Sequence, residues 1–225
     1  MEPFDLYSPL IDADPFPYYA ELREKYPCYW SENAQLWFLS RYDDIVEAAE
    51  YFVHVPLPAG ANLGGITFSG ALRGLLLDAA AANGLTFPAL APATLKRLEA
   101  VLGVGTFIGN PLDSGFAGLG SKEVYIECVS ALLADPAIDI LLLQEELPRG
   151  PGSERKEANL HAVNALASRS KKPIVHVTMI SHGLTDYSRT LREQLPNIGF
   201  MQEIDKTLRA VRAVATYAEH ARQPA

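Results

Sequence analysis

The feature that most constrains the fold is the aliphatic segment Ile138–Leu143, which only Asp139 interrupts. It lacks the alternation of a half-exposed strand and is typical of a strand covered on both faces. The sequence predicts further strands at Leu63–Phe68, Val104–Ile108 and Pro173–Met179, and a short edge strand around Phe200.

Segments of helical character follow these strands. They are Gly70–Ala82, Pro92–Leu102, Ser121–Ala134, Arg155–Arg169, Leu184–Gln194 and Glu203–His220. Pro92 suits a first helical position, Ser121 an N-cap, and Asn83-Gly84 a C-cap. Strands that alternate with helices indicate right-handed crossovers and a parallel sheet. We therefore predict an α/β fold, a flavodoxin-like doubly wound parallel sheet of about five strands in the order 2-1-3-4-5.

The first fifty residues have a different character, since they are rich in aromatic and charged side chains. The pattern predicts a helix at Tyr18–Lys25, a strand at Leu36–Ser40, and a helix that Asp43 or Asp44 caps and that runs through Glu50. This is too little material for a two-layer core of its own. We predict a small α+β N-terminal appendage.

The prolines and the glycine between residues 56 and 60 separate this appendage from the rest of the chain. The predicted domains are residues 1–52 and residues 53–225.

Charge and composition exclude several classes of partner. The net charge is −8 and no basic stripe is present, so we expect no nucleic-acid partner and no anionic membrane surface. The longest apolar stretches are too short to span a bilayer. Cys28 and Cys128 have no metal-ligand spacing, and the N-terminus lacks the pattern of a signal peptide. These observations favour a cytoplasmic protein with reduced thiols and no metal site.

The sharpest candidate site is the turn Ser69-Gly70-Ala71, where the first strand of the predicted α/β domain enters its helix. Small residues there let the amides of the first helical turn face an anion, and the helix dipole adds positive charge. The alternative is a plain tight turn with Ser69 as N-cap. The turn is neither a Walker A loop nor a GxGxxG motif.

Three other polar groups lie after predicted strands. Asn110 and Asp113 belong on the same rim as Ser69, where they position a phosphate or close the turn through bonds to the backbone. For Gln144-Glu145-Glu146, a solvated loop is favoured over acid–base chemistry. His182 has no metal-ligand or triad spacing, and we expect no catalytic role for it.

Several segments, in this order and spacing, resemble the C-terminal flavodoxin-like subdomain of the ADP-forming (NDP-forming) acyl-CoA synthetases, relatives of succinyl-CoA synthetase. The resemblance runs over Val55–Ala218, and the segments are residues 57–85, 110–116, 132–150, 171–177 and 199–218. In that family a histidine of a neighbouring subdomain carries a phosphoryl group between a CoA site and an ATP-grasp domain.

The resemblance implies that the helix beginning at Ser69, Gly70 and Ala71 binds the phosphate of that histidine, with Asn110 and Asp113 lining the cleft. The complete family enzyme uses CoA and ATP/ADP with Mg²⁺. The family's Ser-His-Thr-Gly segment is absent upstream of Pro56, and Ser181-His182-Gly183 follows the wrong strand to replace it. The CoA-binding and ATP-grasp domains are absent too, so the resemblance implies partner domains on another chain.

Residues 5–50 resemble the start of a bacterial cytochrome P-450, through the runs Asp14–Tyr19 and Leu36–Val46. In those enzymes the corresponding segment forms the first helix and a small β-hairpin. The cysteine-containing haem-ligand loop is absent, so haem binding is not expected. Joined family fragments of this kind indicate a gene fusion, a deletion product or a chimera.

Three functions follow from the sequence. The first is a ligase subdomain that depends on partner domains. The second is a non-catalytic CoA- or phosphate-binding or structural remnant of a gene fusion. The third and least favoured is a fragment of a haem-thiolate monooxygenase.

Overall fold

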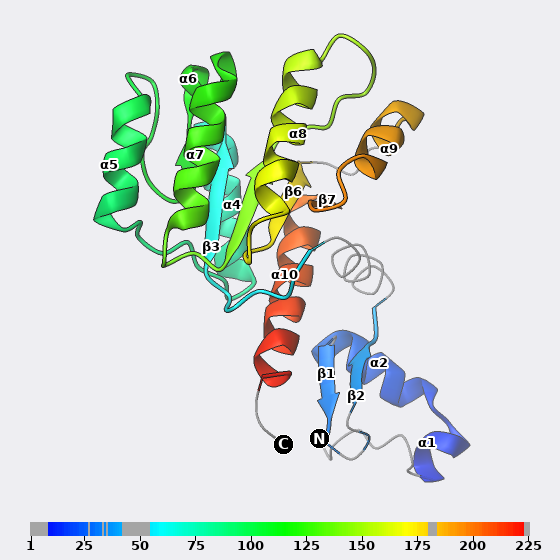
Figure 1. Ribbon diagram of the computed structural model, residues 1–225. Helices are drawn as coiled ribbons and strands as arrows, with labels where there is room; N and C mark the ends of the chain where they lie inside the picture. Colours follow the sequence, from blue (N-terminus) through cyan, green and yellow to red (C-terminus); the bar gives the residue numbers. More distant parts are fainter. Residues whose placement is uncertain are drawn as a thin grey trace.

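The computed structural model describes residues 9–26, 28–32, 34, 36–41, 55–179 and 184–222 (Figure 1). The described part consists of an α/β domain and a small N-terminal unit. The predicted domain boundary at residues 52–53 and the predicted helix ending at Glu50 lie outside these ranges.

A five-stranded parallel sheet forms the centre of the α/β domain. Its strands are β3 (Leu63–Thr67), β4 (Leu112–Asp113), β5 (Ile140–Gln144), β6 (Ile174–Thr178) and β7 (Gly199–Gln202). They lie in the order β4-β3-β5-β6-β7, which is the predicted 2-1-3-4-5 order. The predicted flavodoxin-like fold is therefore confirmed.

Helices cover both faces of this sheet (Figure 1). One face carries α4 (Gly70–Ala82) and α10 (Ile204–His220). The other carries α5 (Pro92–Val101), α6 (Gly115–Gly120), α7 (Lys122–Ala134), α8 (Glu154–Ala167) and α9 (Asp186–Glu193). Within the described ranges, none of the helices combines the length and apolarity that crossing a bilayer requires.

Strand β5 shows why helices must cover both faces of the sheet. All five of its residues are buried, and successive side chains point to opposite faces. Ile140 and Leu142 belong to the core under α4 and α10, whereas Leu141 and Leu143 belong to the core under α5, α7 and α8. Each fully buried aliphatic side chain contributes about 1.5–3 kcal/mol to the stability of the fold, relative to leaving it exposed.

Helix α10 packs against the sheet through an apolar stripe. Its buried apolar residues include Ile204, Leu208, Val211, Val214 and Ala218. Just beyond the helix, the Arg222 guanidinium donates hydrogen bonds to the carbonyl oxygens of Pro58 and Ala59. This contact ties the end of α10 to the segment that leads into β3.

One predicted strand is wrong. Val104–Ile108 does not enter the sheet as a strand, because Val104 is exposed and Gly105 takes φ +86° in a turn. Phe107 forms only an isolated antiparallel bridge with Asp113. The edge strand is instead the two-residue β4, which follows the Asn110-Pro111 turn.

The N-terminal unit has a separate core. It contains α1 (Pro9–Ala13), α2 (Phe16–Lys25) and the antiparallel strands β1 (Cys28–Ser31) and β2 (Leu36–Leu39). Ile11 and Leu22 are its buried residues, and Tyr18, Tyr29 and Phe38 pack against them. The predicted helix and strand are thus present, and α1 and β1 are additional. The unit lies beside the C-terminal half of α10 (Figure 1).

His176 is an unusual member of the sheet. It lies in the middle of β6, it is 1% exposed, and its ring contacts Phe200 at a centroid distance of 5.3 Å. Neither ring nitrogen has a hydrogen-bond partner among the described residues. Burial, together with the positive charges of Lys156 and Arg192, lowers the pKa of His176 to about 3. The folded protein therefore keeps this ring neutral.

Replacing His176 with Leu is expected to stabilise the protein. An unsatisfied buried polar group costs about 1–3 kcal/mol, so the free energy of unfolding at pH 7 should rise by that order. The wild type should also lose stability as pH falls from 6.5 towards 3, because only the unfolded chain takes up the proton. This residue alone contributes a slope of up to about 1.4 kcal/mol per pH unit.

Urea denaturation of wild type and His176→Leu between pH 7 and pH 5 measures both effects. His161→Leu, which replaces an exposed histidine of α8, is the control and should keep the wild-type slope. Equal slopes in wild type and His176→Leu would contradict the neutral buried ring.

Candidate functional site

The N-terminus of α4 lies at the carboxyl edge of the sheet. Strand β3 ends at Thr67, and Ser69 precedes the helix in an extended conformation with φ −150° and ψ 127°. The Ser69 hydroxyl makes no capping hydrogen bond, and the first bond of the helix runs from the Arg73 amide to the Ser69 carbonyl, at 2.9 Å. Ser69 therefore occupies the N-cap position through its backbone, but its side chain does not cap the helix.

The amides of residues 70–72 are consequently available. No oxygen atom in the described ranges accepts a hydrogen bond from them, and Gly70 and Ala71 are exposed. A helix N-terminus carries about half a positive charge and binds anions through such amides. The geometry suits a ligand with several acceptor oxygens.

Arg73 adds a full positive charge one turn into the helix. Its Nε donates to the Pro111 carbonyl at 3.0 Å, and its guanidinium carbon lies 4.0 Å from the centre of the Phe107 ring. These two contacts fix the guanidinium between α4 and the turn before β4. No sequence pattern marks Arg73, because a single arginine inside a helical segment carries no signal of its own.

The Asn110 side chain joins the turn before β4 to strand β3. Its Oδ1 accepts from the Gly65 amide at 3.1 Å, and its Nδ2 donates to the carbonyls of Leu63 at 2.7 Å and Pro88 at 3.0 Å. Of the two roles expected for Asn110, the structure shows turn closure. Its amide is occupied by hydrogen bonds to the backbone.

Asp113 does lie beside α4. A Cβ added to Gly70 would lie 3.5 Å from Asp113 Oδ2, while Asp113 Oδ1 accepts from the Gly115 amide at 3.0 Å. The structure thus brings Asp113 together with Ser69, Gly70 and Ala71. Its carboxylate places a negative charge next to the free amides and competes with any external anion.

Buried polar contacts hold this edge of the sheet together. Thr67 Oγ1 donates to Gln144 Oε1 at 2.9 Å and so joins the ends of β3 and β5. The Ser114 amide and hydroxyl both donate to the Thr67 carbonyl, at 3.0 and 3.2 Å. The strand ends that carry the site are therefore fixed relative to one another.

The solvated loop expected at Glu145 and Glu146 is wrong. The Glu145 side chain is 10% exposed, and Lys156 Nζ lies 3.2 Å from its Oε1. Burial raises the pKa of Glu145, and the nearby Lys156 opposes that rise. Lys156 also donates to the Glu146 carbonyl, and Glu146 Oε1 accepts from the Met179 amide at 2.7 Å. These carboxylates join β5 to α8 and β6.

The other sequence candidates lie elsewhere. His182 falls outside the described residues. Cys128 is buried in α7, and Cys28 is half-buried in β1; neither forms a disulfide.

Comparisons with known proteins agree with this architecture. No family model matches the chain. Over 101 residues the sequence is 32% identical to a trans-feruloyl-CoA synthase from an unidentified prokaryotic organism, an alignment that covers 45% of this chain and 14% of the synthase.

Two solved structures share the fold. PH0766 from Pyrococcus horikoshii OT3 matches with a TM-score of 0.66 and 23% identity, over 81% of this chain and 41% of that one. The apo dinucleotide-forming acetyl-coenzyme A synthetase 1 of Ca. Korarchaeum cryptofilum matches with a TM-score of 0.61 and 18% identity, over 82% and 40%. The chain therefore spans about two fifths of the solved chains. The P-450 resemblance of residues 5–50 gains no support from these relatives.

Replacing Asn110 with Ala is expected to destabilise the fold by about 1–3 kcal/mol, because the Gly65 amide and two carbonyls lose their partner. Asn110→Asp keeps the acceptor for Gly65 but loses both donors, so it should be destabilised as well. Thermal and urea unfolding measure the change. Values within 0.5 kcal/mol of wild type for both variants would show that Asn110 does not hold this turn.

Proposed function

We propose that this chain is a subdomain of an ADP-forming acyl-CoA synthetase, an acid–thiol ligase, and that it acts together with CoA-binding and ATP-grasp domains on another polypeptide. The observation that carries the proposal is the N-terminus of α4, with three available amides at the carboxyl edge of a parallel sheet. Ligands of open α/β sheets bind at that edge. CoA and ATP/ADP with Mg²⁺ belong to the partner domains in this proposal.

The comparisons support the proposal in two ways. The matched relatives include a trans-feruloyl-CoA synthase and an acetyl-coenzyme A synthetase, both named for acyl-CoA formation. The solved chains are also more than twice as long as the part that this chain covers. A fold that recurs as part of longer chains fits the role of a subdomain.

The role proposed for Ser69, Gly70 and Ala71 is to bind the phosphoryl group of a phosphohistidine on the partner. That group carries up to two negative charges and three acceptor oxygens, which match the amides of residues 70–72 and the helix dipole. Arg73 adds a fixed positive charge. Donors held in place before the phosphoryl group arrives need no reorganisation, which is the condition for strong electrostatic stabilisation.

A reconstitution assay tests the proposed role. The chain is mixed with an ADP-forming synthetase that lacks its own copy of this subdomain, and acyl-CoA formation is measured. We expect activity to be restored, and Gly70→Pro to lower it by about tenfold to a hundredfold, because a donor amide is lost. Proline suits the first helical position, and the extended Ser69 accepts a following proline, so the variant should fold.

Gly70→Ala is the matched control. Its Cβ has room at 3.5 Å from Asp113 Oδ2, and its amide remains, so it should restore activity as the wild type does. Failure of the wild-type chain to restore activity at saturating partner would refute the ligase role. Equal activity of the proline and alanine variants would refute the role of the Gly70 amide.

A non-catalytic remnant is the second candidate, and the position of Asp113 favours it. A carboxylate beside Gly70 already supplies negative charge to the helix N-terminus. Inorganic phosphate would then bind weakly.

Asp113→Asn distinguishes a phosphate-binding α4 N-terminus from a purely structural remnant. The asparagine keeps an acceptor for the Gly115 amide and removes the charge. If the α4 N-terminus binds anions, phosphate affinity should rise about two- to fivefold. Amide NMR shifts of Gly70 and Ala71 during a phosphate titration report on this site alone. Asp78→Asn, at an exposed position of α4, is the charge-matched control and should change nothing. Unmoved Gly70 and Ala71 signals in all three proteins would favour the remnant.

A further inference from the structure

The protein has a second positively charged region, which is separate from the N-terminus of α4. It is a cleft of about 350 Å³ between the N-terminal unit and α10. Lys25 and Arg41 come from the N-terminal unit, and Arg209 and Arg212 come from α10. None of the described residues that line this cleft is acidic, although the chain as a whole carries a net charge of −8.

Neighbouring carboxylates neutralise part of this charge. Lys25 Nζ lies 3.3 Å from Glu21 Oε1, and Arg209 Nε lies 3.4 Å from Asp205 Oδ2. Among the described residues, these four cations and two carboxylates sum to a charge of +2. Bringing like charges together across a cleft is unfavourable, so an anion between the two units would stabilise their arrangement.

Arg212 is the cation best placed to bind a ligand. It is exposed on α10, and its guanidinium has no hydrogen bond or ion pair with any residue that the structure describes. A guanidinium presents two parallel donors to phosphate oxygens, and such charge-assisted pairs are the stronger kind of hydrogen bond.

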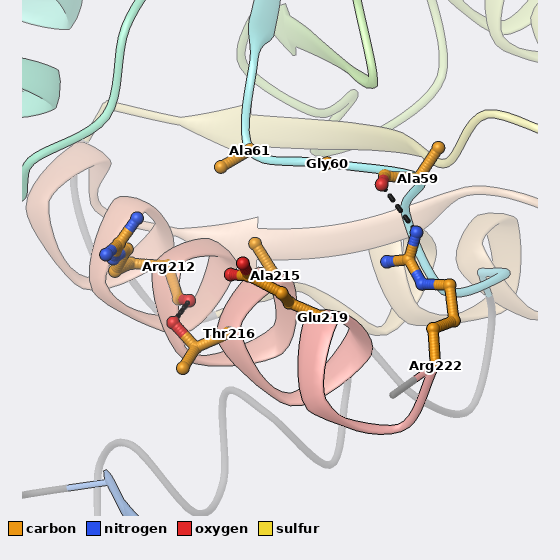
Figure 2. Close-up of a pocket in the computed structure, with 8 residues that line it drawn as sticks. All are labelled: Ala59, Gly60, Ala61, Arg212, Ala215, Thr216, Glu219 and Arg222. Atoms are coloured by element: carbon orange, nitrogen blue, oxygen red, sulfur yellow. Dashed lines mark hydrogen bonds between the residues drawn. The ribbon is translucent and has the colours of Figure 1, made fainter. Parts of the chain in front are cut away.

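A second hollow adjoins the cleft along α10 and shares Arg212 and Thr216 with it (Figure 2). Figure 2 shows Arg222 at one end of this hollow, where it reaches the Ala59 carbonyl, and Arg212 at the other end. The Arg222 guanidinium is thus occupied by the backbone. Arg212 lies where the two hollows meet. The second hollow also carries the Glu219 carboxylate, which balances the charge of Arg222, so the hollow adds space next to Arg212 and no further positive charge.

We propose that this basic cleft binds a small phosphorylated ligand of the diphosphate class. Its volume lies in the range of small-molecule sites, and a diphosphate carries the two to three negative charges that the local positive charge would balance. Tyr26, which is 40% exposed at the edge of the cleft, offers an aromatic face to a base if the ligand is a nucleotide. The site is separate from the α4 N-terminus.

Isothermal titration of the full chain with pyrophosphate at low salt tests the proposal. Saturable binding is expected, and Arg212→Gln and Arg41→Gln should each weaken it about tenfold through loss of a charged hydrogen-bond donor. Raising the salt concentration should weaken it further. Arg189→Gln, which removes an exposed arginine of α9, is the control and should leave the affinity unchanged.

Two further arms identify the site and the ligand. Gly70→Pro should leave pyrophosphate binding unchanged, which distinguishes the cleft from the α4 N-terminus. Titration with ADP then shows which part of the ligand is recognised. Equal affinities for ADP and pyrophosphate would indicate recognition of the diphosphate alone, whereas tighter binding of ADP that Tyr26→Ala removes would indicate recognition of a nucleotide. Either result supports the cleft. Absence of saturable pyrophosphate binding, full affinity in both arginine variants, or loss of binding in Gly70→Pro would overturn it.

Discussion

Burial of the parallel sheet on both faces is the constraint on which the rest of the structure depends. Strand β5 has no exposed residue, so helices must pack above and below it, and each crossover returns the chain to the same edge of the sheet. The start of α4, the turn at Asn110 and the carboxylates after β5 therefore meet at one rim. Their proximity follows from the topology and does not require adjacent positions in the sequence.

That rim combines fixed and available polar groups. Asn110, Thr67 and Glu145 are occupied by contacts within the protein, whereas the amides at the start of α4 are available among the described residues. Asp113 stands between the two kinds, because one of its oxygens closes a turn and the other lies beside Gly70. The balance between its negative charge and the positive charge of Arg73 sets how strongly this edge attracts a phosphoryl group.

Much of the fold was predictable because its signals are local. The aliphatic run of β5 and the apolar stripe of α10 specify their elements directly, and the alternation of strands with helices along the chain indicates a parallel sheet. Strand β4 was misplaced because two residues carry no periodicity, while the apolar Val104 is exposed. The pairing of Glu145 with Lys156 and the fixing of Arg73 by Pro111 depend on residues distant in sequence. Pattern analysis of one sequence cannot detect such pairs.

The contact of Arg222 with the carbonyls of Pro58 and Ala59 has a consequence for modularity. It places the entry to the first sheet strand and the exit from the last helix side by side. A domain whose two ends meet in this way can be inserted into, or excised from, a larger polypeptide without pulling its strands apart. The same architecture can then recur within chains of very different length and domain order.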